Sequence, residues 1–386
     1  MKKDYPLPER IRIAQQFDIP GDVYMVTPYG GGHINDTYAA ETIVPLEDGR
    51  AMRRFIIQRI NTEVFAKPRE VMSNIRKVTE QQRESILNSG GDASRECLTL
   101  VRTTDGAECL EREEDQTFWR CYCFVEGART CEFIRDDAKG REMAYQAAKM
   151  FGDFHRQLSG LPGSELHETI PHFHHTPRRT RQLEEAIASD AAKRVSRCES
   201  EIEFARSLYP MASMLVDAMA GGELPVRVCH NDTKINNILF DFHSPADRAM
   251  TIIDLDTVMP GTMLYDFGDL VRTSTWPGAE DERDASKVYV SMDLFESLVK
   301  GWLAGAGDIM TASERTRLDI AGKIITYTIG IRFLADHLNG DKYFAIHRDG
   351  QNLDRARVQF AIIRDMDRQE KAMQEIVQRA LDGCEQ

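Results

Sequence analysis

The sequence predicts an α+β fold of two lobes, a small amino-terminal lobe with an antiparallel sheet and one helix, and a larger, mainly helical lobe. The chain has 386 residues, which is more than a single hydrophobic core usually organises. Strand-like patterns gather in the first 125 residues, and helical periodicity dominates the remainder. Apolar residues make up 42% of the chain and charged residues 29%, so there is enough apolar material for real cores.

The amino-terminal lobe is predicted to contain a β-hairpin. Residues 37–44 and 52–60 are rich in β-branched and aromatic side chains, and the turn signal at 47–49 separates them. A glycine-rich stretch at 30–32 precedes the hairpin. A helix is predicted from Pro68, because apolar residues then recur at helical spacing and proline suits a first helical turn.

We place the lobe boundary after the next predicted strand, 119–125, where Glu126 and Gly127 end the apolar pattern. The lobes are then residues 1–125 and residues 126–386. Helices are expected through the second lobe, including a single last helix through residues 358–376. Two short strands, 237–241 and 250–255, are expected to interrupt them.

The most informative motif lies next to these two strands. Residues 230–237 read HNDTKINN, which has the form HxDxxxxN. Phosphoryl transfer needs a carboxylate that orients or deprotonates the attacking hydroxyl, and oxygen ligands for magnesium. Asp232 and Asn237 fit these two tasks, and Lys234 is placed to approach the phosphoryl group. Taken alone, the pattern also fits a loop whose polar side chains only make turns and caps.

A second acidic motif follows in the order that a metal-dependent kinase needs. An apolar strand ends at Asp254, seventeen positions after Asn237, and the run continues as IDxDxxxxGxxxxDxG. We expect Asp254 to bind magnesium. Asp266 is expected to hold the loop around Asp232 through hydrogen bonds to backbone amides. The order and spacing of the two motifs make chance a poor explanation.

With these motifs the chain resembles the aminoglycoside phosphotransferase and choline kinase superfamily, a branch of the protein-kinase-like fold. The match extends to FVEG at 124–127, which is similar to the hinge whose backbone holds adenine, and to the helix at 147–155. The resemblance implies a two-lobe kinase with ATP and Mg²⁺ as cofactors. Residues 1–125 would then bind the nucleotide, and residues 126–386 would carry catalysis and substrate binding. The resemblance also implies that Phe124 and Glu126 bind the nucleotide.

The glycine-rich element GGGHINDTY, residues 30–38, is a candidate phosphate-binding turn, because successive backbone N–H groups can cradle phosphates. It matches neither GxGxxG nor the Walker pattern, so an ordinary turn is the alternative reading. Its position before the hairpin favours the phosphate role. We select Gly31, Gly32 and Asn35 for it.

Kinases of this fold usually carry a phosphate-binding lysine on the second hairpin strand. Here that strand reads FIIQRI at 55–60 and has no lysine. We expect Arg59 to replace it, with Glu70 on the following helix as its partner. The alternative is that Gln58 occupies the inward face of the strand.

Over a longer span the chain is similar to the N-acetylhexosamine 1-kinases, which phosphorylate the anomeric hydroxyl of N-acetylglucosamine or N-acetylgalactosamine. The matching segments are 32–38, 58–61, 168–174, 332–341 and 352–357. This resemblance implies a sugar substrate and carbohydrate metabolism. Arg332 and Asp336 are four residues apart on an expected helix, so they share a face that could bond sugar hydroxyls, with Asp232 as the third substrate residue. An intrahelical ion pair is the alternative.

Four other functions stay open. The acceptor could be another small metabolite, such as choline, homoserine or an aminoglycoside. The DxDxT at Asp254 also occurs in haloacid dehalogenase phosphatases, where the first aspartate is a nucleophile. His172, His174 and His175 could hold a hydrolytic metal, although no partner motif accompanies them. A kinase-shaped binding module without catalysis is disfavoured by the intact Asp232, Asn237 and Asp254.

Composition narrows the partners and the compartment. The net charge of -13 would repel a polyphosphate backbone, so nucleic acid is not an expected partner. Neither a signal-peptide pattern nor an apolar run of membrane-spanning length occurs. We therefore expect a cytoplasmic protein without a membrane partner, whose eight scattered cysteines are reduced.

Overall fold

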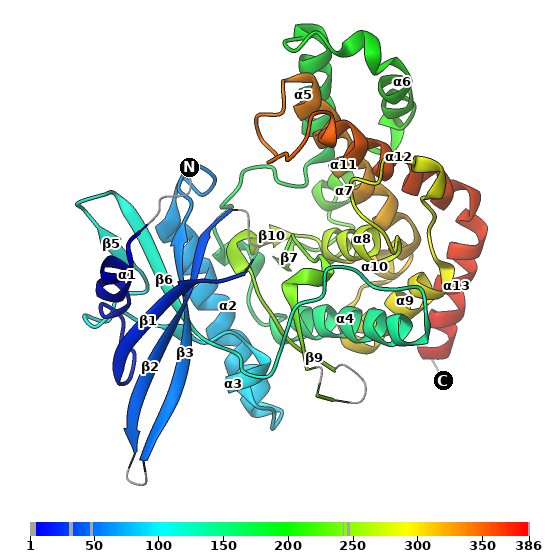
Figure 1. Ribbon diagram of the computed structural model, residues 1–386. Coiled ribbons are helices and arrows are strands. Elements are labelled where there is room, and N and C mark those ends of the chain that lie inside the picture. The colour runs from blue at the N-terminus through cyan, green and yellow to red at the C-terminus, as the bar shows by residue number, and fades with distance from the viewer. Residues whose placement is uncertain (1–4, 31–33, 47–48, 242, 245–247, 385–386) are drawn as a thin grey trace. The chain divides into compact units, whose positions relative to one another are not determined.

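The computed structural model describes residues 5–30, 34–46, 49–241, 243–244 and 248–384 (Figure 1). The chain forms two compact units. The first comprises Met1–Ala128 together with two later segments, Leu166–Ile170 and Thr251–Val258. The second comprises Arg129–Glu165, Pro171–Met250 and Met259–Gln386. The amino-terminal region carries an antiparallel sheet and the carboxyl-terminal part is mostly helical, so the predicted α+β class is confirmed.

The first unit is built on a six-stranded sheet with the order β1-β2-β3-β6-β4, in which β5 also pairs with β6 (Figure 1). Its strands are β1 (Asp22–Pro28), β2 (Asp36–Leu46), β3 (Gly49–Ile60), β4 (Leu100–Val101), β5 (Leu110–Arg112) and β6 (Thr117–Cys123). Every pairing in this sheet is antiparallel. The predicted hairpin is β2 and β3, and residues 47 and 48 of its turn lie outside the described residues.

The two faces of this sheet have different partners. One face of the sheet carries an apolar core that it shares with helix α1 (Leu7–Ala14). The side chains of Tyr38, Ile57 and Trp119 point to this face. Gln58 and Arg120 are cross-strand partners, and each lies one position along its strand from a residue of that core. The side chains of Gln58 and Arg120 therefore point to the opposite face, because successive side chains of a strand alternate.

Helix α2 (Pro68–Asn88) ties the two later segments into the first unit. Asn74 of α2 donates to the carbonyl oxygens of His167 and Val258, at 2.8 and 2.9 Å. The His167 amide donates back to the Asn74 side chain at 2.9 Å. The short helix α3 (Ala93–Glu96) follows α2 in this unit. The segment around Asp254 is thus held by residues from the first third of the chain.

The second unit is mainly helical. Its helices are α4 (Ala138–Gln157), α5 (Thr176–Ser189), α6 (Glu199–Ser207), α7 (Met214–Ala220), α8 (Met263–Ser274), α9 (Met292–Ala306), α10 (Ala312–Arg315), α11 (Leu318–Leu338), α12 (Gln351–Arg368) and α13 (Glu370–Cys384). Helix α8 is buried along almost its whole length, as expected of a helix that is surrounded by others. Helices α4 and α9 approach closely at Gly152 and Gly305, where an added Cβ on Gly152 would lie 2.8 Å from the Gly305 Cα atom.

The prediction of one continuous last helix was wrong. The apolar periodicity is divided between α12 and α13, and Gln369 lies at the junction with φ of -106°. The Gln369 side chain donates to the Val290 carbonyl oxygen at 3.0 Å, and Asp365 accepts from the Val290 amide at 2.6 Å. Tertiary hydrogen bonds accompany the break, and neither glycine nor proline marks it in the sequence.

Short strands flank the two acidic motifs. Strand β7 (Arg227–Cys229) pairs with β10 (Met259–Gly261), and β8 (Ile238–Asp241) pairs with β9 (Arg248–Ile252). The expected strand at 250–255 therefore ends earlier, at Ile252. The chain then turns at Asp254, which has a left-handed backbone with φ of 63°. None of the described helices is long and apolar enough to cross a membrane.

Candidate active site

Helix α8 anchors the HxDxxxxN loop through one carboxylate. Asp266 accepts hydrogen bonds from the backbone amides of His230 at 2.8 Å and Asn231 at 2.7 Å. The Thr233 hydroxyl donates to the Asp266 carbonyl oxygen at 2.5 Å. The prediction that Asp266 holds this loop through backbone amides is confirmed. Because both partners are buried, the loop has little freedom to leave this arrangement.

Asn231 gives the loop its direction. Its backbone is left-handed, with φ of 64°, a conformation that asparagine tolerates better than most residues. The Asn231 side chain donates to the carbonyl oxygens of Cys229 and Met259, at 3.1 and 3.3 Å. Its own carbonyl oxygen lies 2.9 Å from Nε2 of His174. The turn therefore presents Asp232 from a backbone that is fixed on several sides.

The three polar residues of the loop lie together. Lys234 Nζ is 2.8 Å from Oδ2 of Asp232. The Asn237 amide donates to the same carboxylate oxygen at 3.0 Å and to the Asp232 carbonyl oxygen at 2.8 Å. Burial raises the pKa of Asp232, but the charge and hydrogen bond of Lys234, together with His230 and the Asn237 hydrogen bond, outweigh burial, so the pKa lies below its usual value. Asp232 is ionised at neutral pH and can accept a proton or a hydrogen bond.

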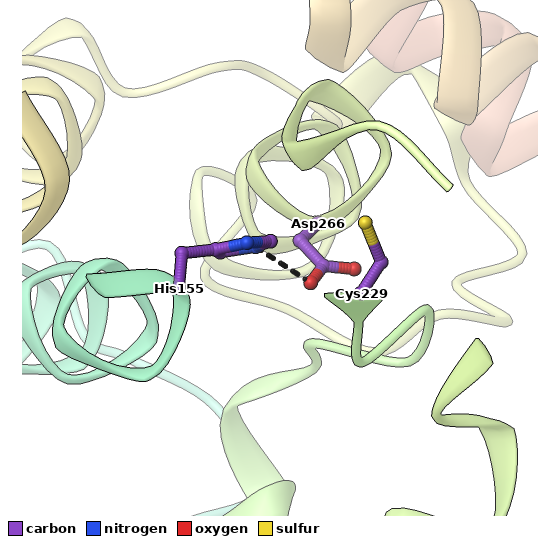
Figure 2. A group of neighbouring side chains, drawn as sticks. All are labelled: His155, Cys229 and Asp266. Atoms are coloured by element: carbon purple, nitrogen blue, oxygen red, sulfur yellow. Dashed lines mark hydrogen bonds and ion pairs between the residues drawn. The ribbon is translucent and has the colours of Figure 1, made fainter. Parts of the chain in front are cut away.

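His155, Cys229 and Asp266 form a buried group near the base of this loop (Figure 2). Their donor atoms lie within 4.8 Å of one another, which is a metal-like spacing. However, both Asp266 oxygens already accept N–H groups, and His155 Nε2 lies 2.9 Å from one of them. Burial raises the pKa of Cys229 well above its usual value, so the thiol stays protonated and is a poor ligand. The arrangement fits a structural brace.

The brace has a measurable pH dependence. Burial raises the pKa of Asp266, but the His155 hydrogen bond and neighbouring groups outweigh burial and hold the pKa below its usual value. Asp266→Asn should destabilise the protein at neutral pH by about 3 kcal/mol, as expected when a buried charged network is broken. A lowered folded-state pKa contributes stability above the unfolded pKa and loses it as pH falls. The difference from wild type should therefore shrink below about pH 4.

Urea unfolding of both proteins at pH 7 and in acid tests this prediction. Asp153→Asn is the matched control on α4, because Asp153 also pairs with cations but is partly exposed. An Asp266→Asn protein as stable as wild type at pH 7, or a stability gap that persists unchanged in acid, would contradict it.

In the first unit, the predicted metal ligand Asp254 lies beside a buried polar network. Asp256, two residues later, forms an ion pair with Arg120 of β6. The Asn35 amide donates to the other Asp256 oxygen at 2.5 Å. The Arg120 guanidinium donates to Gln58 at 2.9 Å. The structure thus places Asn35 next to the acidic segment, while Asp232, Lys234 and Asn237 belong to the second unit.

The expected Arg59–Glu70 pair is not what the structure contains. Arg59 pairs with Asp36 across β2 and β3, with Nε at 2.7 Å from Oδ2. Glu70 instead accepts from Lys67 at 2.9 Å. Arg59 also points to the sheet face that carries Trp119, its cross-strand partner in the α1 core. Strand parity is the reason, because Gln58 takes the other face.

The other nucleotide candidates are placed only in part. Gly31 and Gly32 lie outside the described residues. The Phe124 ring packs against Arg54, whose guanidinium carbon lies 3.8 Å from the ring centroid. The backbone amide of Phe124 donates to the Arg54 carbonyl oxygen. Glu126 forms an ion pair with the same arginine. Tyr29 contacts Phe124 edge-on at 5.5 Å.

Arg332 lies within a group of aromatic rings in the second unit. Its guanidinium carbon is 5.1 Å from the ring centroid of Phe173, 5.7 Å from Tyr343 and 5.3 Å from Phe344. Arg179 lies nearby and donates to the Phe173 carbonyl oxygen at 3.0 Å. We call these five residues the arginine–aromatic cluster. Burial, reinforced by the charge of Arg332, lowers the pKa of Arg179 to about 10.

Asp336 has a different role from the one expected. Its carboxylate accepts hydrogen bonds from the backbone amides of Lys342, Tyr343 and Phe344, each at 2.9 Å. Asn352 donates to it at 3.0 Å. Four donors fill the carboxylate, so Asp336 fixes the loop that carries two rings of the cluster and does not pair with Arg332.

The histidines at positions 172, 174 and 175 have different contacts. His174 is buried, and its Nε2 faces the Asn231 carbonyl oxygen. His175 Nδ1 accepts from the Arg178 amide at 3.2 Å and begins helix α5. The His172 ring packs edge-on against His175 at 5.5 Å. Within the described part of the chain, these histidines do not form a metal-binding group.

Sequence reasoning missed Arg120, Tyr343 and Phe344. A signal for Arg120 exists, because a lone arginine within the apolar strand TFWRCYC needs a buried partner. Tyr343 and Phe344 lie in a loop after α11, where no periodicity indicates what a side chain contacts.

The chain is similar to a known protein family and to several solved structures. A family model described as the phosphotransferase enzyme family matches residues 100–306. An aminoglycoside phosphotransferase from Alicyclobacillus acidocaldarius has a similar structure, with a TM-score of 0.62 and 15% identity over 98% of both chains.

Two further solved structures have the same fold. A choline kinase from Cryptosporidium parvum matches with a TM-score of 0.56 and 14% identity, over 95% of this chain and 96% of that one. A spectinomycin phosphotransferase, solved with ADP and spectinomycin, matches with a TM-score of 0.55 and 12% identity, over 93% of this chain and 98% of that one. At such identities the similarity establishes the fold.

Proposed function

Because the chain belongs to the phosphotransferase enzyme family, we propose that it transfers the γ-phosphoryl group of ATP to the anomeric hydroxyl of an N-acetylhexosamine. The product is the sugar 1-phosphate. The resemblance to N-acetylhexosamine 1-kinases motivates the choice of sugar, and the arginine–aromatic cluster is the observation that carries it. ADP bound to the spectinomycin phosphotransferase supports a nucleotide donor here.

Asp232 is the catalytic residue of this proposal. It is ionised, it is held in a rigid loop, and it accepts the proton of the attacking hydroxyl. Lys234 stabilises the same carboxylate from 2.8 Å and can approach the transferred group. Since phosphoryl transfer depends chiefly on positioning and charge neutralisation, the rigidity of the loop contributes as much as its basicity.

The oxygen donors present fit magnesium. The Asn237 amide nitrogen is used by Asp232, which turns the side-chain carbonyl oxygen toward other partners. Asp254 contributes a carboxylate. Oxygen ligands of these two kinds are what Mg²⁺ prefers, and the ion would neutralise charge on the nucleotide phosphates. Gly31, Gly32 and Asn35 are proposed to cover the phosphates, and the hinge residues Phe124 and Glu126 to hold the base.

The charge of the arginine–aromatic cluster favours a neutral sugar over a cationic acceptor. Within the described part of the chain, the Arg332 and Arg179 guanidinium groups form no ion pair with a carboxylate. The charge of Asp269 also acts on Arg332, but the two neighbouring guanidinium groups still disfavour choline, ethanolamine and aminoglycosides, which are themselves cationic. Guanidinium groups instead donate to hydroxyl and amide oxygens, and ring faces contact the apolar face of a sugar.

The buried His174 adds a hydrogen-bond acceptor near this cluster. Its ring lies 4.6 Å from Phe173, and Nδ1 has no partner among the described residues. Burial lowers the pKa of His174, so the ring is neutral at pH 7, and Nε2 is the nitrogen that donates to Asn231. Nδ1 is then an acceptor that suits a hydroxyl or an N-acetyl N–H group.

A coupled assay of ATP consumption tests the acceptor. N-acetylglucosamine or N-acetylgalactosamine should support turnover, and phosphorus NMR should find the phosphate on the anomeric carbon. Arg332→Met should raise the sugar KM roughly 10- to 100-fold and leave the ATP KM unchanged, as expected for a lost charged hydrogen bond of about 1.5–3 kcal/mol. Asp336→Ala should act in the same direction by loosening the loop that carries Tyr343.

Arg364→Met is the matched control, because Arg364 also stacks on a ring, that of Phe204 at 4.0 Å, outside the cluster. It should leave both KM values unchanged. Turnover of choline or an aminoglycoside without turnover of any N-acetylhexosamine would reject the sugar assignment and keep the kinase.

A further inference from the structure

A buried arginine occupies the sheet face from which strand β3 would normally present a lysine. Gln58 takes the β3 position on this face, and it accepts a hydrogen bond from Arg120, its partner on β6. The Gln58 amide donates in turn to the Thr37 hydroxyl at 3.0 Å. A positive charge next to Gln58 on this face therefore comes from Arg120, one strand away from the expected lysine.

Arg120 is directed at the acidic segment that contains Asp254. It is 1% exposed, and it forms an ion pair with Asp256, which is 3% exposed. Burial lowers the pKa of Arg120, but the charges of Asp256, Tyr122 and Asp254 and the hydrogen bond to Asp256 together outweigh burial and raise it, so Arg120 keeps its positive charge. A buried pair is stable only with good geometry and with its other polar atoms bonded. Gln58 and Asn35 provide those bonds.

Asn35 extends the network toward the glycine-rich stretch of the sequence. Its amide donates to Asp256 at 2.5 Å, and its side-chain oxygen accepts from the Asn61 backbone amide at 3.0 Å. Thr169 donates to the Asp256 carbonyl oxygen at 3.2 Å. The Asp256 side chain therefore fixes Asn35, and the Thr169 hydrogen bond fixes the Asp256 backbone. Asp254, with its left-handed backbone, is two residues away.

Tyr122 supplies an independent observation. It lies on β6 two residues after Arg120, whose guanidinium carbon is 5.4 Å from the Tyr122 ring centroid. Tyr122 is 5% exposed, and its hydroxyl group is buried without a hydrogen-bond partner among the described residues. A buried hydroxyl usually has a partner. An unpartnered buried hydroxyl calls for an explanation, and a ligand that binds beside the ion pair would supply one.

We propose that Arg120 and Asp256 form the positioning ion pair of the nucleotide site, in place of a lysine on strand β3. The pair holds Asn35 toward the phosphates and keeps the left-handed turn of Asp254 in the conformation that binds magnesium. Tyr122 completes the same network when Mg–nucleotide is bound. The inference rests on the proposed kinase function for the roles of Asn35 and Asp254.

The physical argument lies in strain and geometry. A left-handed backbone at a residue other than glycine persists only where the surroundings over-determine it. The planar guanidinium of Arg120 bonds Gln58 and Asp256 at once, and a lysine ammonium lacks that fork. Arg120→Lys keeps the charge and loses the geometry, so it separates positioning from simple neutralisation.

The experiment measures Mg–ADP binding by calorimetry for wild type, Arg120→Lys, Asp256→Asn and Tyr122→Phe. The first two variants should bind Mg–ADP roughly tenfold or more weakly, on the scale that small misplacements cause. Steady-state assays should show a raised ATP KM and a raised magnesium requirement, with the acceptor KM unchanged. Tyr122→Phe should weaken binding less and should fold as wild type.

Arg112→Lys is the control, because Arg112 is a half-buried arginine of the same sheet that pairs with Glu9 of α1. It should leave Mg–ADP affinity unchanged. Equal Mg–ADP affinity in wild type and in folded Arg120→Lys and Tyr122→Phe would overturn the inference alone. A wild-type protein that binds no Mg–ADP would overturn the proposed function, and the inference with it.

Discussion

Asp232→Asn is expected to fold as wild type does and to lose phosphoryl transfer by roughly 100-fold or more, the scale for removal of a positioned proton acceptor. Asparagine matches the size of aspartate and keeps one oxygen for Asn237, whose amide donates at 3.0 Å. It cannot take the proton of the attacking hydroxyl. The loss should fall on kcat, with the ATP KM and the acceptor KM close to their wild-type values.

Asp241→Asn is a suitable control for this variant, since Asp241 ends the strand that follows the same loop and its side chain accepts from the His243 amide at 2.9 Å. Its kcat should equal that of wild type. Turnover near wild type in Asp232→Asn would show that another group takes the proton. Circular dichroism and thermal unfolding of both variants exclude misfolding as the cause of a loss.

The second large effect is expected from Asp254→Asn, which should also lower activity by roughly 100-fold at ordinary magnesium concentration, because a positioned charge at the metal is lost. An amide oxygen is a weaker ligand than a carboxylate for a hard cation. Raised Mg²⁺ should therefore restore part of the lost activity. The measurement is a magnesium titration of kcat at saturating ATP and acceptor.

The two variants should respond differently to magnesium, and this contrast is the diagnostic result. Asp232→Asn should gain nothing from added Mg²⁺, because its defect concerns a proton. An Asp254→Asn protein that binds nucleotide normally and stays inactive at every magnesium concentration would reject the ligand role of Asp254. Asp256→Asn should differ from both, because its defect also weakens nucleotide binding.

Local patterns predicted the elements that depend on near neighbours. The hairpin of β2 and β3 followed from alternation around a turn signal, and α2 from apolar spacing after a proline. Asp266 was predicted to hold the loop because a carboxylate in this motif order needs backbone donors, and the His230 and Asn231 amides provide them. Each of these inferences uses an interaction whose chemistry is visible in the sequence.

The errors arose where a distant residue decides the outcome. Arg59 is adjacent to Gln58, and only the register of β3 against β6 decides which of the two faces Arg120. Asp336 was expected to share a helix face with Arg332 and to bind sugar hydroxyls, and the sequence did not reveal that the loop after α11 folds back onto its carboxylate. The junction at Gln369 depends on a hydrogen bond to Val290, 79 positions away.

The sequence by itself determined the fold class and the phosphotransfer chemistry, because a carboxylate, an amide and a second acid at fixed spacing place their oxygens within a few residues of two short strands. The tertiary structure decided which cation meets which acid. Arg120 and Asp256 are separated by 136 positions, and Arg332 meets Tyr343 and Phe344 only after a loop reverses the chain. Such pairings depend on strand register and loop closure. Both are determined in the folded protein, because buried charges are stable only when paired and apolar faces are stable only when packed.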